Sequence, residues 1–530
     1  MNGIIIYLIL LYSELLKRPD LIHSKNLPSF TQSLSNEEKN QLLQAYKELL
    51  TQYPKSIYLP LLLLNLMEEE EYCIFLKQQV YKAIRKGIPS FFHSLLPLFQ
   101  HTPEKLNLLK KLCLEAYEQL KTTHYLEEGI EEEPFTFLWC VLLLAEIEDY
   151  EHHFEKALQY VNEGLEHTPT CCDAYRLKSK IYKHAGYLKQ SEEEMEKGYE
   201  IDKFDRFMNT KCVKSCLLAC HIEKADEIAS YWTRVNVPLR IDFETVEACW
   251  YELRCARASY RLKDYPHAFK LFSTVLNHFN TFVTEQFDFH EYVLRKSDLL
   301  TYAHFLQTID HVYEHPYFIE AAIGALQCAI TIFDHPFNET EYCQHFTLTK
   351  PMVHKKGAEF KDDKDPDGLK LIQDKKMYEN LLPTVTQLLQ SAKNHRKVMV
   401  LIVEWAKRIN KKQICEEAIE NLKTCCNASF DVAYCSKLID SSFEITRNDD
   451  LSSIHNRNMM AKIELLENPS HSVFDILTKQ WELVKRDDLE EFIEGYQLLC
   501  TNDQAKLQEY VHLVESIYPG FEEAVDCWVH

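Results

Sequence analysis

Two histidines four residues apart are the first candidates for catalytic chemistry. In the stretch His311-Val-Tyr-Glu-His315, Glu314 stands where an inverted zinc hydrolase carries its general base. Such histidines bind zinc from one face of a helix, together with a third ligand. Pro316 follows His315 directly, so a helix is expected to end here, and no third-ligand motif accompanies the pair. A zinc hydrolase therefore remains an alternative that a metal assay can test.

Other motifs of enzymes and cofactor sites are absent from the sequence. It contains no Cys-x2-Cys pair, no Gly-x-Gly and no Gly-x4-Gly-Lys-Ser/Thr, so zinc ribbons, dinucleotide folds and P-loops are unsupported. The Gln/Arg-x2-Gly-x-Gly/Ala turn of acetyl-coenzyme A sites is missing too. We therefore expect no catalytic residue, no metal site and no cofactor of the chain's own.

Basic side chains with aromatic neighbours give a stronger functional signal. The chain has 59 basic and 81 acidic residues, a net charge of −22, so its general surface repels phosphate backbones. Against this background six cations fall on helices that begin repeat units: Arg176, Lys180, Lys183, Lys214, Arg257 and Arg261. Phe207 and Trp250 lie between them, and such aromatic residues often anchor protein interfaces. Clustered cations repel one another, so the set favours an anionic or acidic partner.

A repeated helix pair has to position these side chains. Ala157, Ser191 and Ala225 are 34 residues apart in similar phrases, and a fourth copy carries Ala268 after a longer connection at 234–243. This spacing, with small residues where helices touch, is typical of the tetratricopeptide repeat. Glycine occurs only 11 times and apolar residues follow helical spacing. The sequence therefore predicts an all-α solenoid, a right-handed superhelix of helix pairs.

The first helix of each pair is expected to line a concave groove. If the small residue at Ala145, Ser179, Val213 or Ala256 is position eight, positions two, five, nine, twelve and thirteen face inward. The second repeat places there Asp173, Arg176, Lys180, Lys183 and His184; the third Phe207, Thr210, Lys214, Leu217 and Leu218; the fourth Trp250, Leu253, Arg257, Tyr260 and Arg261. The sequence thus predicts a basic and aromatic inner surface.

The cysteines and the N-terminal apolar run indicate a compartment. Eighteen cysteines in 530 residues, without a secretory signal, favour a reduced cytoplasmic protein in which they act as small buried hydrophobes. The apolar run 4–11 is too short to span a bilayer. We expect it to be part of a core helix whose partner is missing, in a chain that opens within a solenoid, and we expect no membrane association.

Repeat regularity and charge divide the chain into four regions. We expect irregular helical repeats with a truncated N-terminus at 1–133 and the tetratricopeptide-repeat core at 134–335. A charged and partly mobile linker is expected at 336–376, because this stretch is polar and rich in charge. Helical repeats of weaker periodicity are expected at 377–530.

Four phrases resemble the auxiliary subunit of the N-terminal acetyltransferase A complex. They are Lys86-Gly-x-Pro89, Lys178-x-Lys-Ile-Tyr-Lys-His184-x-Gly, Asp205-Arg-Phe-x-Asn-x-Lys-Cys212 and Gln286-Phe-Asp-Phe-His290-x-Tyr-x2-Arg-Lys296. The last two are the most specific, since the repeat fold does not require their residues. The similarity covers the middle of the chain and, more weakly, its C-terminal part, from about residue 40 to about residue 520.

The resemblance implies a non-catalytic scaffold. In that family the superhelix wraps the catalytic acetyltransferase, orients it toward short N-termini such as Ser, Ala or Thr, and helps to place it at the ribosome and its nascent chains. Arg206, Phe207 and Trp250 match positions used against the catalytic subunit, and the groove positions add Leu217, Leu218 and Arg257. Family members also hold inositol hexakisphosphate between their subunits. The matching residues are Lys178, Lys180, Tyr182, Lys183, His184, Lys211 and Lys214.

Two departures from the family bear on ribosome docking. The family's first repeats, roughly a third of its length, have no counterpart here, and its long basic helix is replaced by the mixed-charge linker at 338–376. Both weaken an expectation of ribosome binding. A different tetratricopeptide adaptor that binds acidic peptides or protein partners is the alternative function, because it would use the same basic groove.

Overall fold

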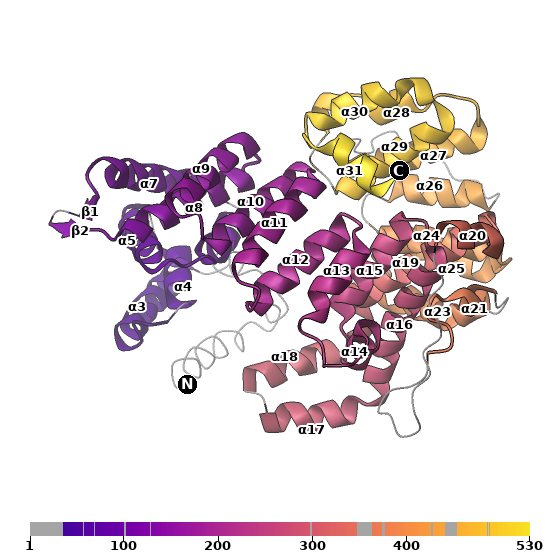
Figure 1. The fold of residues 1–530 in the computed structure, drawn as a ribbon, viewed down its shortest axis with the longest axis horizontal. Helices are drawn as coiled ribbons and strands as arrows, with labels where there is room; N and C mark the ends of the chain where they lie inside the picture. Colours follow the sequence, from indigo (N-terminus) through magenta and orange to yellow (C-terminus); the bar gives the residue numbers. More distant parts are fainter. Residues whose placement is uncertain are drawn as a thin grey trace. The chain divides into compact units, whose positions relative to one another are not determined.

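The computed structural model describes residues 35–529, except for gaps at 57, 68, 100–101, 128, 297–298, 347–362, 374–376, 426–427, 440–452, 485 and 487. Within these residues helices follow one another through short turns, as Figure 1 shows. The predicted all-α solenoid of helix pairs is confirmed there, apart from one small hairpin. The helix expected around residues 4–11 lies outside the described residues.

The chain divides into two compact units. Unit 1 comprises Met1–His184 and Glu200–Asp202, and unit 2 comprises Ala185–Tyr199 and Lys203–His530. The regions predicted at 1–133, 134–335, 336–376 and 377–530 follow changes in repeat regularity, and their boundaries differ from that of the compact units. The tetratricopeptide core is therefore shared between both units.

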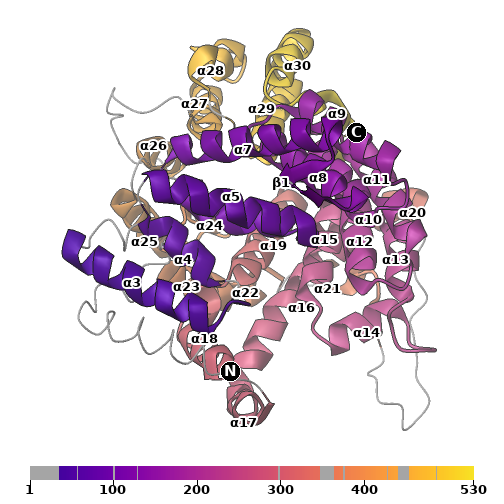
Figure 2. The same ribbon diagram turned by 90° about the vertical axis from the view of Figure 1, so that its left-hand side faces the viewer.

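Unit 1 packs its helices around a leucine-rich core. Its elements are α3 (Asn36–Gln52), α4 (Tyr58–Leu66), α5 (Glu69–Lys86), α6 (Phe91–Phe99), α7 (Pro103–Thr122), β1 (Tyr125–Glu127), β2 (Ile130–Glu131), α8 (Pro134–Tyr150), α9 (Phe154–His167) and α10 (Cys172–Ala185). Helices α5, α7 and α8 lie side by side (Figures 1 and 2), and Leu76, Leu109 and Leu144 between them are fully buried.

The acidic stretch before the regular repeats forms a small hairpin. Strands β1 and β2 pair antiparallel as a short hairpin. The guanidinium of Arg85 on α5 binds its carboxylates, with Nη2 2.9 Å from Glu127 Oε2 and Nε 3.0 Å from Glu132 Oε1. This ion pair gives the acidic segment a fixed place on unit 1.

Unit 2 contains the remaining helices. They are α11 (Leu188–Ile201), α12 (Arg206–Leu218), α13 (Ile222–Ser230), α14 (Leu239–Thr245), α15 (Cys249–Arg261), α16 (Tyr265–Thr284), α17 (Gln286–Lys296), α18 (Leu299–Ile309), η2 (Val312–Glu314), α19 (Pro316–Asp334), α20 (Glu339–His345), α21 (Leu369–Gln373), α22 (Met377–Asn380), α23 (Leu382–Ser391), α24 (Arg396–Arg408), α25 (Lys412–Thr424), α26 (Ser429–Leu438), α27 (Ile454–Glu467), α28 (Phe474–Thr478), η3 (Trp481–Leu483), α29 (Leu489–Asn502), η4 (Gln504–Lys506), α30 (Leu507–Glu515) and α31 (Phe521–Trp528).

Helix α19 is the centre of the larger core in unit 2. It is long and apolar enough by composition to cross a membrane, but 56% of its apolar window is buried within the protein. It packs against α16 and α24, and Gly324 leaves room for the ring of Phe272, which a Cβ would approach to 2.2 Å. These contacts explain the apolar composition of α19 as that of a core helix.

The repeats turn at an equivalent residue in each helix pair. His152, Gly186, Cys220 and Lys263 all have positive φ, and each stands five residues before the small residue of the following helix. After the turn, His221 N donates to Cys216 O (2.9 Å), which closes the end of α12 as in a Schellman motif. The 34-residue spacing in the sequence is therefore also a spacing of left-handed turns.

The same turn recurs in the C-terminal region, where the sequence indicated only weak periodicity. Asn410 has φ 55° between α24 and α25, and the N–H of Lys411 donates to Ala406 O at 2.9 Å. Asparagine adopts this conformation more readily than most residues. Helices α24 and α25 thus form another pair of the tetratricopeptide type.

The described parts of the charged linker contain short helices and contact the start of α16. Helix α20 begins it, and Tyr342 on this helix donates its hydroxyl hydrogen to Asp264 Oδ1 at 2.8 Å. At its far end Lys270 Nζ lies 2.7 Å from Asp363 Oδ2. Both contacts attach the linker to α16 and its N-terminal turn. These described residues thus pack against the start of α16, and the prediction of a partly mobile linker stays a prediction.

The last helix of the chain returns to the start of unit 2. The N–H of Gly520 donates to the carbonyl of Ala185 at 2.8 Å. A Cβ on Gly520 would lie 2.5 Å from the backbone nitrogen of Tyr187, so only glycine allows this approach. Lys189 N also donates to Glu523 Oε1 at 2.6 Å. Helices α11 and α31 are thus joined across more than 300 residues of sequence.

Candidate functional site

Aromatic rings covered by cations form the candidate site on unit 2. Phe207 on α12 is 53% exposed, and Lys211 Nζ lies 5.1 Å from the centre of its ring. Lys214, one turn further along α12, places Nζ 5.0 Å from the ring of Trp250 on α15. Cation–π contacts of this kind hold a flexible lysine against a ring. The structure therefore brings the predicted residues Phe207, Lys214 and Trp250 onto neighbouring helices.

Local capping fixes the direction of Phe207. Asp205 precedes α12, and its carboxylate accepts a hydrogen bond from Phe207 N at 2.8 Å. Asp is a strong N-cap residue because it satisfies an otherwise unpaired N–H. The carboxylate of Asp205 is thus already engaged in a hydrogen bond within the chain. Arg206 and Phe207 in the first turn remain exposed to solvent.

Cations crowd around Lys214. Burial lowers the pKa of Lys214, and the charges of Arg254 and Lys211 lower it further. Arg254 was missed in the sequence, although it occupies position six of its repeat helix, as Lys211 does. Its Nη1 donates to Trp250 O at 3.0 Å. Including position six in the inward-facing set would have found this residue.

Several residues predicted to face the groove are instead buried or hydrogen-bonded within the chain. Leu217 is only 1% exposed, so its assignment to a partner surface is wrong: the side chain belongs to the core. Leu253 is fully buried as well. Leu218 is half-buried, and its carbonyl accepts a hydrogen bond from Trp528 Nε1 at 2.9 Å.

The two arginines of α15 are also held inside unit 2. Arg257 donates from Nη1 to Gln327 Oε1 at 3.1 Å, and its Nε lies 3.5 Å from Glu320. Arg261 binds Glu490 Oε1 at 2.9 Å. Helix α19 thus holds Arg257, and α29 holds Arg261; the partner role of Arg257 stays a prediction.

These arginines border a cleft of about 380 Å³ within unit 2. It is lined mainly by ionic side chains that pair across helices: Arg257, Arg261, Lys397, Glu404, His455, Lys462, Glu490 and Glu494. For example, Lys462 Nζ lies 2.6 Å from Glu494 Oε1. This pairing ties α15, α27 and α29 together, although basic side chains outnumber acidic ones in the lining.

Helix α10 of unit 1 carries the first part of the predicted inositol phosphate site. His184 Nδ1 lies 2.9 Å from Asp149 Oδ1, and Lys180 Nζ lies 3.4 Å from Asp149 Oδ2. Burial alone would raise the pKa of Asp149, but the hydrogen bond with His184 and the charge of Lys180 outweigh it and lower the pKa. A buried carboxylate therefore already neutralises part of this basic face.

The remaining residues of the set are distributed over two helices. Lys178, Tyr182 and Lys183 lie on α10, whereas Lys211 and Lys214 lie on α12. These two helices belong to different units. An inositol phosphate site formed by all seven residues stays a prediction.

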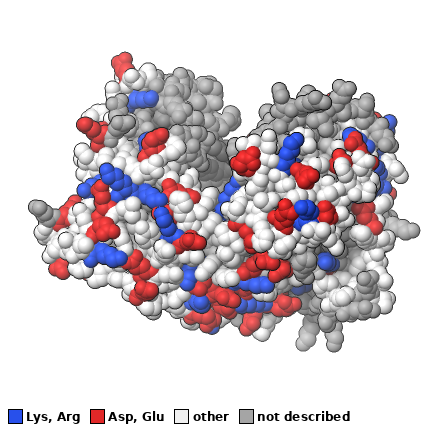
Figure 3. All heavy atoms as spheres, turned by 90° about the horizontal axis from the view of Figure 1, so that it is seen from above, with Lys and Arg blue, Asp and Glu red and all other residues white. Residues whose placement is uncertain are grey.

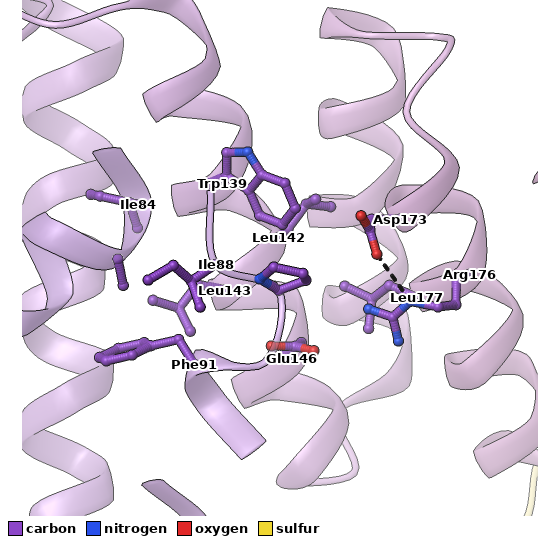
Figure 4. A pocket seen from close by; sticks show the side chains of 12 residues that line it. Ile84, Ile88, Phe91, Trp139, Leu142, Leu143, Glu146, Asp173, Arg176 and Leu177 are labelled. Carbon is purple, nitrogen blue, oxygen red and sulfur yellow. Dashed lines mark hydrogen bonds and ion pairs between the residues drawn. The ribbon is translucent and has the colours of Figure 1, made fainter. Parts of the chain in front are cut away.

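A small pocket on unit 1 adjoins the start of α10 (Figure 4). Ile88, Trp139 and Leu142 give it apolar walls, and the carboxylate of Glu146 lies at one side. Burial raises the pKa of Glu146 to about 7. The pocket volume is about 20 Å³, room for a single water molecule, so it is too small for a cofactor.

The histidine pair of the zinc alternative does not share a helix. His311 and His315 flank the short 3-10 turn η2, and His315 Nδ1 accepts a hydrogen bond from Tyr317 N at 3.1 Å as the cap of α19. Burial lowers the pKa of His315. The helical geometry that this zinc motif requires is therefore not formed.

One other group of side chains has the composition of a metal site. Ligand atoms of Glu148, Glu151 and His153 lie within 4.8 Å of one another. The ammonium group of Lys110 binds both carboxylates, with Nζ 2.9 Å from Glu148 Oε1. An internal cation thus already balances this group, which links α7 to α8.

Charge on the rest of the surface is mixed. Figure 3 shows acidic and basic side chains interspersed over the face that it draws.

The described cysteines are all free thiols, and burial raises the pKa of Cys140 and Cys255 to about 12. These thiols are packing groups, in agreement with the sequence analysis.

Paired helices at a 34-residue spacing, with aromatic and basic side chains on α12 and α15, define a helical-repeat binding protein. The sequence model of the family described as N-terminal acetyltransferase A, auxiliary subunit, matches residues 10–351. The chain belongs to this family.

Curated relatives carry the same description. The human N-alpha-acetyltransferase 16, NatA auxiliary subunit, is 33% identical over 303 residues, which are 56% of this chain and 35% of the relative. The Arabidopsis thaliana N-terminal acetyltransferase A complex auxiliary subunit NAA15 is 31% identical over 303 residues, 57% of this chain and 34% of the relative. The matched part thus spans about a third of the length of these relatives.

A solved structure supports the fold. In the structure of Naa15/Naa10 bound to HypK-THB, a chain superposes with a TM-score of 0.63 at 21% identity. The superposition covers 93% of this chain and 66% of that chain. Almost the whole length of the chain therefore has the helical arrangement seen there.

Proposed function

We propose that this chain is the non-catalytic scaffold of an N-terminal protein acetyltransferase complex. It binds the catalytic subunit and orients it for acetylation of nascent chains during translation in the cytoplasm. The observation that carries the proposal is the surface of Arg206, Phe207 and Trp250 on α12 and α15. The family resemblance implies that these residues match positions used against the catalytic subunit, and Phe207 and Trp250 are held by capping and by cation–π contacts.

The scaffold acts through contacts alone. Rigid helix pairs hold the partner's substrate-binding loops in a shape that accepts small first residues, so that binding energy is used for orientation. Preorganised aromatic anchors lose little conformational entropy on binding. The acetyl transfer itself takes place on the partner.

Inositol hexakisphosphate is a proposed structural ligand of the assembled complex. Lys183 on α10 and Lys214 on α12 each carry the positive charge that phosphate groups favour, as do the other basic residues of the predicted set. Lys180 and His184 would share their charge between the ligand and Asp149. Ribosome contact stays a prediction, which the mixed-charge linker at 338–376 weakens.

Affinity purification of the full chain, followed by mass spectrometry, tests the function. A small acetyltransferase at one-to-one stoichiometry, with activity toward Ser- or Ala-starting peptides, is the expected result. Recovery of chaperones or other proteins with acidic tails, and no acetyltransferase, would instead support an adaptor for acidic peptides. Stoichiometric zinc in the purified chain would point to a metalloenzyme.

A further inference from the structure

An exposed group of three aromatic side chains lies next to the proposed binding surface. Phe204, Tyr231 and Trp232 are 77%, 52% and 38% exposed. Their rings contact edge to face, with 6.0 Å between the centroids of Phe204 and Tyr231 and 6.2 Å between those of Tyr231 and Trp232. We call these three residues the aromatic patch. Contiguous exposed apolar side chains of this size often mark an interaction site.

Arg206 connects the aromatic patch to Phe207. Its guanidinium carbon lies 5.8 Å from the ring of Trp232, at the end of α13, while Phe207 is its neighbour in the first turn of α12. The patch is therefore continuous with the surface already described. Along it, cations cover rings three times: Arg206 on Trp232, Lys211 on Phe207 and Lys214 on Trp250.

Two cations on this surface lack an acidic partner within the described part of the chain. There, Arg206 and Lys214 take part in no ion pair. Nearby carboxylates are already used: Asp205 caps α12, and Asp226 accepts a hydrogen bond from the hydroxyl of Tyr251. Lys180 and His184 on α10 differ, because Asp149 binds both. The chemistry that complements α12 is thus apolar with flanking carboxylates.

We propose that the aromatic patch extends the docking surface for the catalytic acetyltransferase and binds a segment of that partner in which carboxylates flank an apolar side chain. The apolar side chain packs against Tyr231 and Trp232, and a carboxylate pairs with Arg206. This inference rests on the proposed function, whose contacts at Phe207 and Trp250 can be tested separately.

The test measures the affinity of the full-length chain for the purified catalytic subunit of its own complex. The double variant Tyr231→Ser/Trp232→Ser is expected to raise the dissociation constant about tenfold or more. Leu483→Ser is the matched control, since Leu483 is 52% exposed like Tyr231 and lies on η3 far along the sequence. It should change the affinity less than about twofold. Circular dichroism and thermal unfolding check that each variant is folded.

A salt titration tests the carboxylate part of the proposal. Raising sodium chloride from 50 to 500 mM, about a threefold shorter screening length, should weaken binding of the unmodified chain more than binding of Arg206→Gln. An equal salt dependence would overturn the pairing of a partner carboxylate with Arg206.

The remaining outcomes separate this inference from the function on which it rests. If Tyr231→Ser/Trp232→Ser binds as tightly as the unmodified chain while Phe207→Ala binds weakly, the patch is not part of the interface and the scaffold function stands. If the unmodified chain does not bind the catalytic subunit, both proposals fail. If light scattering shows a dimer of the chain alone that the double variant abolishes, a second copy covers the patch and the inference is wrong.

Discussion

The guanidinium of Arg261 stacks on the indole ring of Trp528, with 3.7 Å between its Cζ and the ring centroid. These residues stand on α15 and at the end of α31, so the contact joins the fourth predicted repeat to the C-terminus of the chain. Glu490 on α29 binds the same guanidinium. Arg261, which was predicted to face the groove, thus links α15 to the C-terminal helices of unit 2.

Replacing Trp528 should destabilise unit 2. Trp528→Ala removes the stack on Arg261 and the hydrogen bond to Leu218 O, at a cost of about 2 kcal/mol in the free energy of unfolding. Trp528→Phe keeps a ring and loses only the hydrogen bond, so it should cost about 1 kcal/mol. Urea unfolding measures both values. An unchanged midpoint for the alanine variant would show that the closure adds no stability.

The proposed interface depends on two rings. Phe207→Ala and Trp250→Ala should each weaken binding of the catalytic acetyltransferase by about 2–4 kcal/mol, because buried aromatic anchors dominate such interfaces. Isothermal titration calorimetry gives the affinity. Leu466→Ala is the control, since Leu466 on α27 has comparable exposure at 46%. Equal affinities for all variants would place the interface elsewhere.

Inositol phosphate binding depends on charge. Lys180→Glu/Lys183→Glu should reduce retention of inositol hexakisphosphate by the purified complex, because two cations become anions beside Asp149. Lys412→Glu/Lys423→Glu, at two exposed positions of α25, makes the same change in net charge and is the control. Mass spectrometry of the released ligand measures retention. Undiminished retention would mean that the ligand binds away from α10.

Stability should depend on pH through His455. Burial alone would lower its pKa, but hydrogen bonds with Asp431 and Glu491 raise the pKa to about 9. The folded-state pKa thus lies above that of an unfolded histidine, about 6.5, so the stabilisation is complete below pH 6.5 and is lost as the pH rises to 9. The full shift corresponds to about 3 kcal/mol. Arg396 also binds Asp431, and Lys397 Nζ lies 3.5 Å from Glu491 Oε1.

Urea unfolding at pH 6, 7.5 and 9 measures this loss. His455→Gln keeps a polar side chain and removes the titration, so its stability should vary much less over the same pH range. A variant with the slope of the unmodified protein would assign the pH dependence to other groups.

The left-handed turn at Lys263 is a further determinant of stability. Its φ of 65° is unfavourable for a residue with a Cβ, so Lys263→Gly should stabilise the protein by about 1 kcal/mol. Lys263→Ala keeps the Cβ and should leave the thermal midpoint nearly unchanged. A midpoint lowered by the glycine variant would show that the entropy of the unfolded chain outweighs the relief of strain.

Periodicity in the sequence was sufficient to predict the fold and to place part of the candidate site on its helices. Ala157, Ser191 and Ala225 marked the helix pairs correctly because close helix packing needs small residues at fixed intervals. Phe207, Lys214 and Trp250 were placed on neighbouring helices for the same reason. The resemblance to the auxiliary subunits of acetyltransferase A agreed with the family match. Arg254 was missed only because position six was left out of the inward-facing set.

Long-range packing explains what the sequence could not supply. Leu217 and Arg257 were predicted to face a partner because helical position alone does not tell how deeply a residue is buried, or that Gln327 on α19 binds Arg257. The approach of Gly520 to Ala185, and the stack of Arg261 on Trp528, depend on the combined path of all intervening helices. No local spacing records that path.

The sequence by itself determined the helix pairs, their family and the chemical character of α12 and α15. The helix pairs and the character of α12 and α15 follow from local spacing, since a helix repeats its faces every few residues and a repeat every 34, whereas the family follows from the resemblance of four phrases. Only the tertiary structure decided which of the cations are held by the chain's own carboxylates and which remain unpaired in the described residues. That choice depends on burial and on partners distant in sequence: Asp149 holds Lys180, Glu490 holds Arg261, and Arg206 lies on the ring of Trp232.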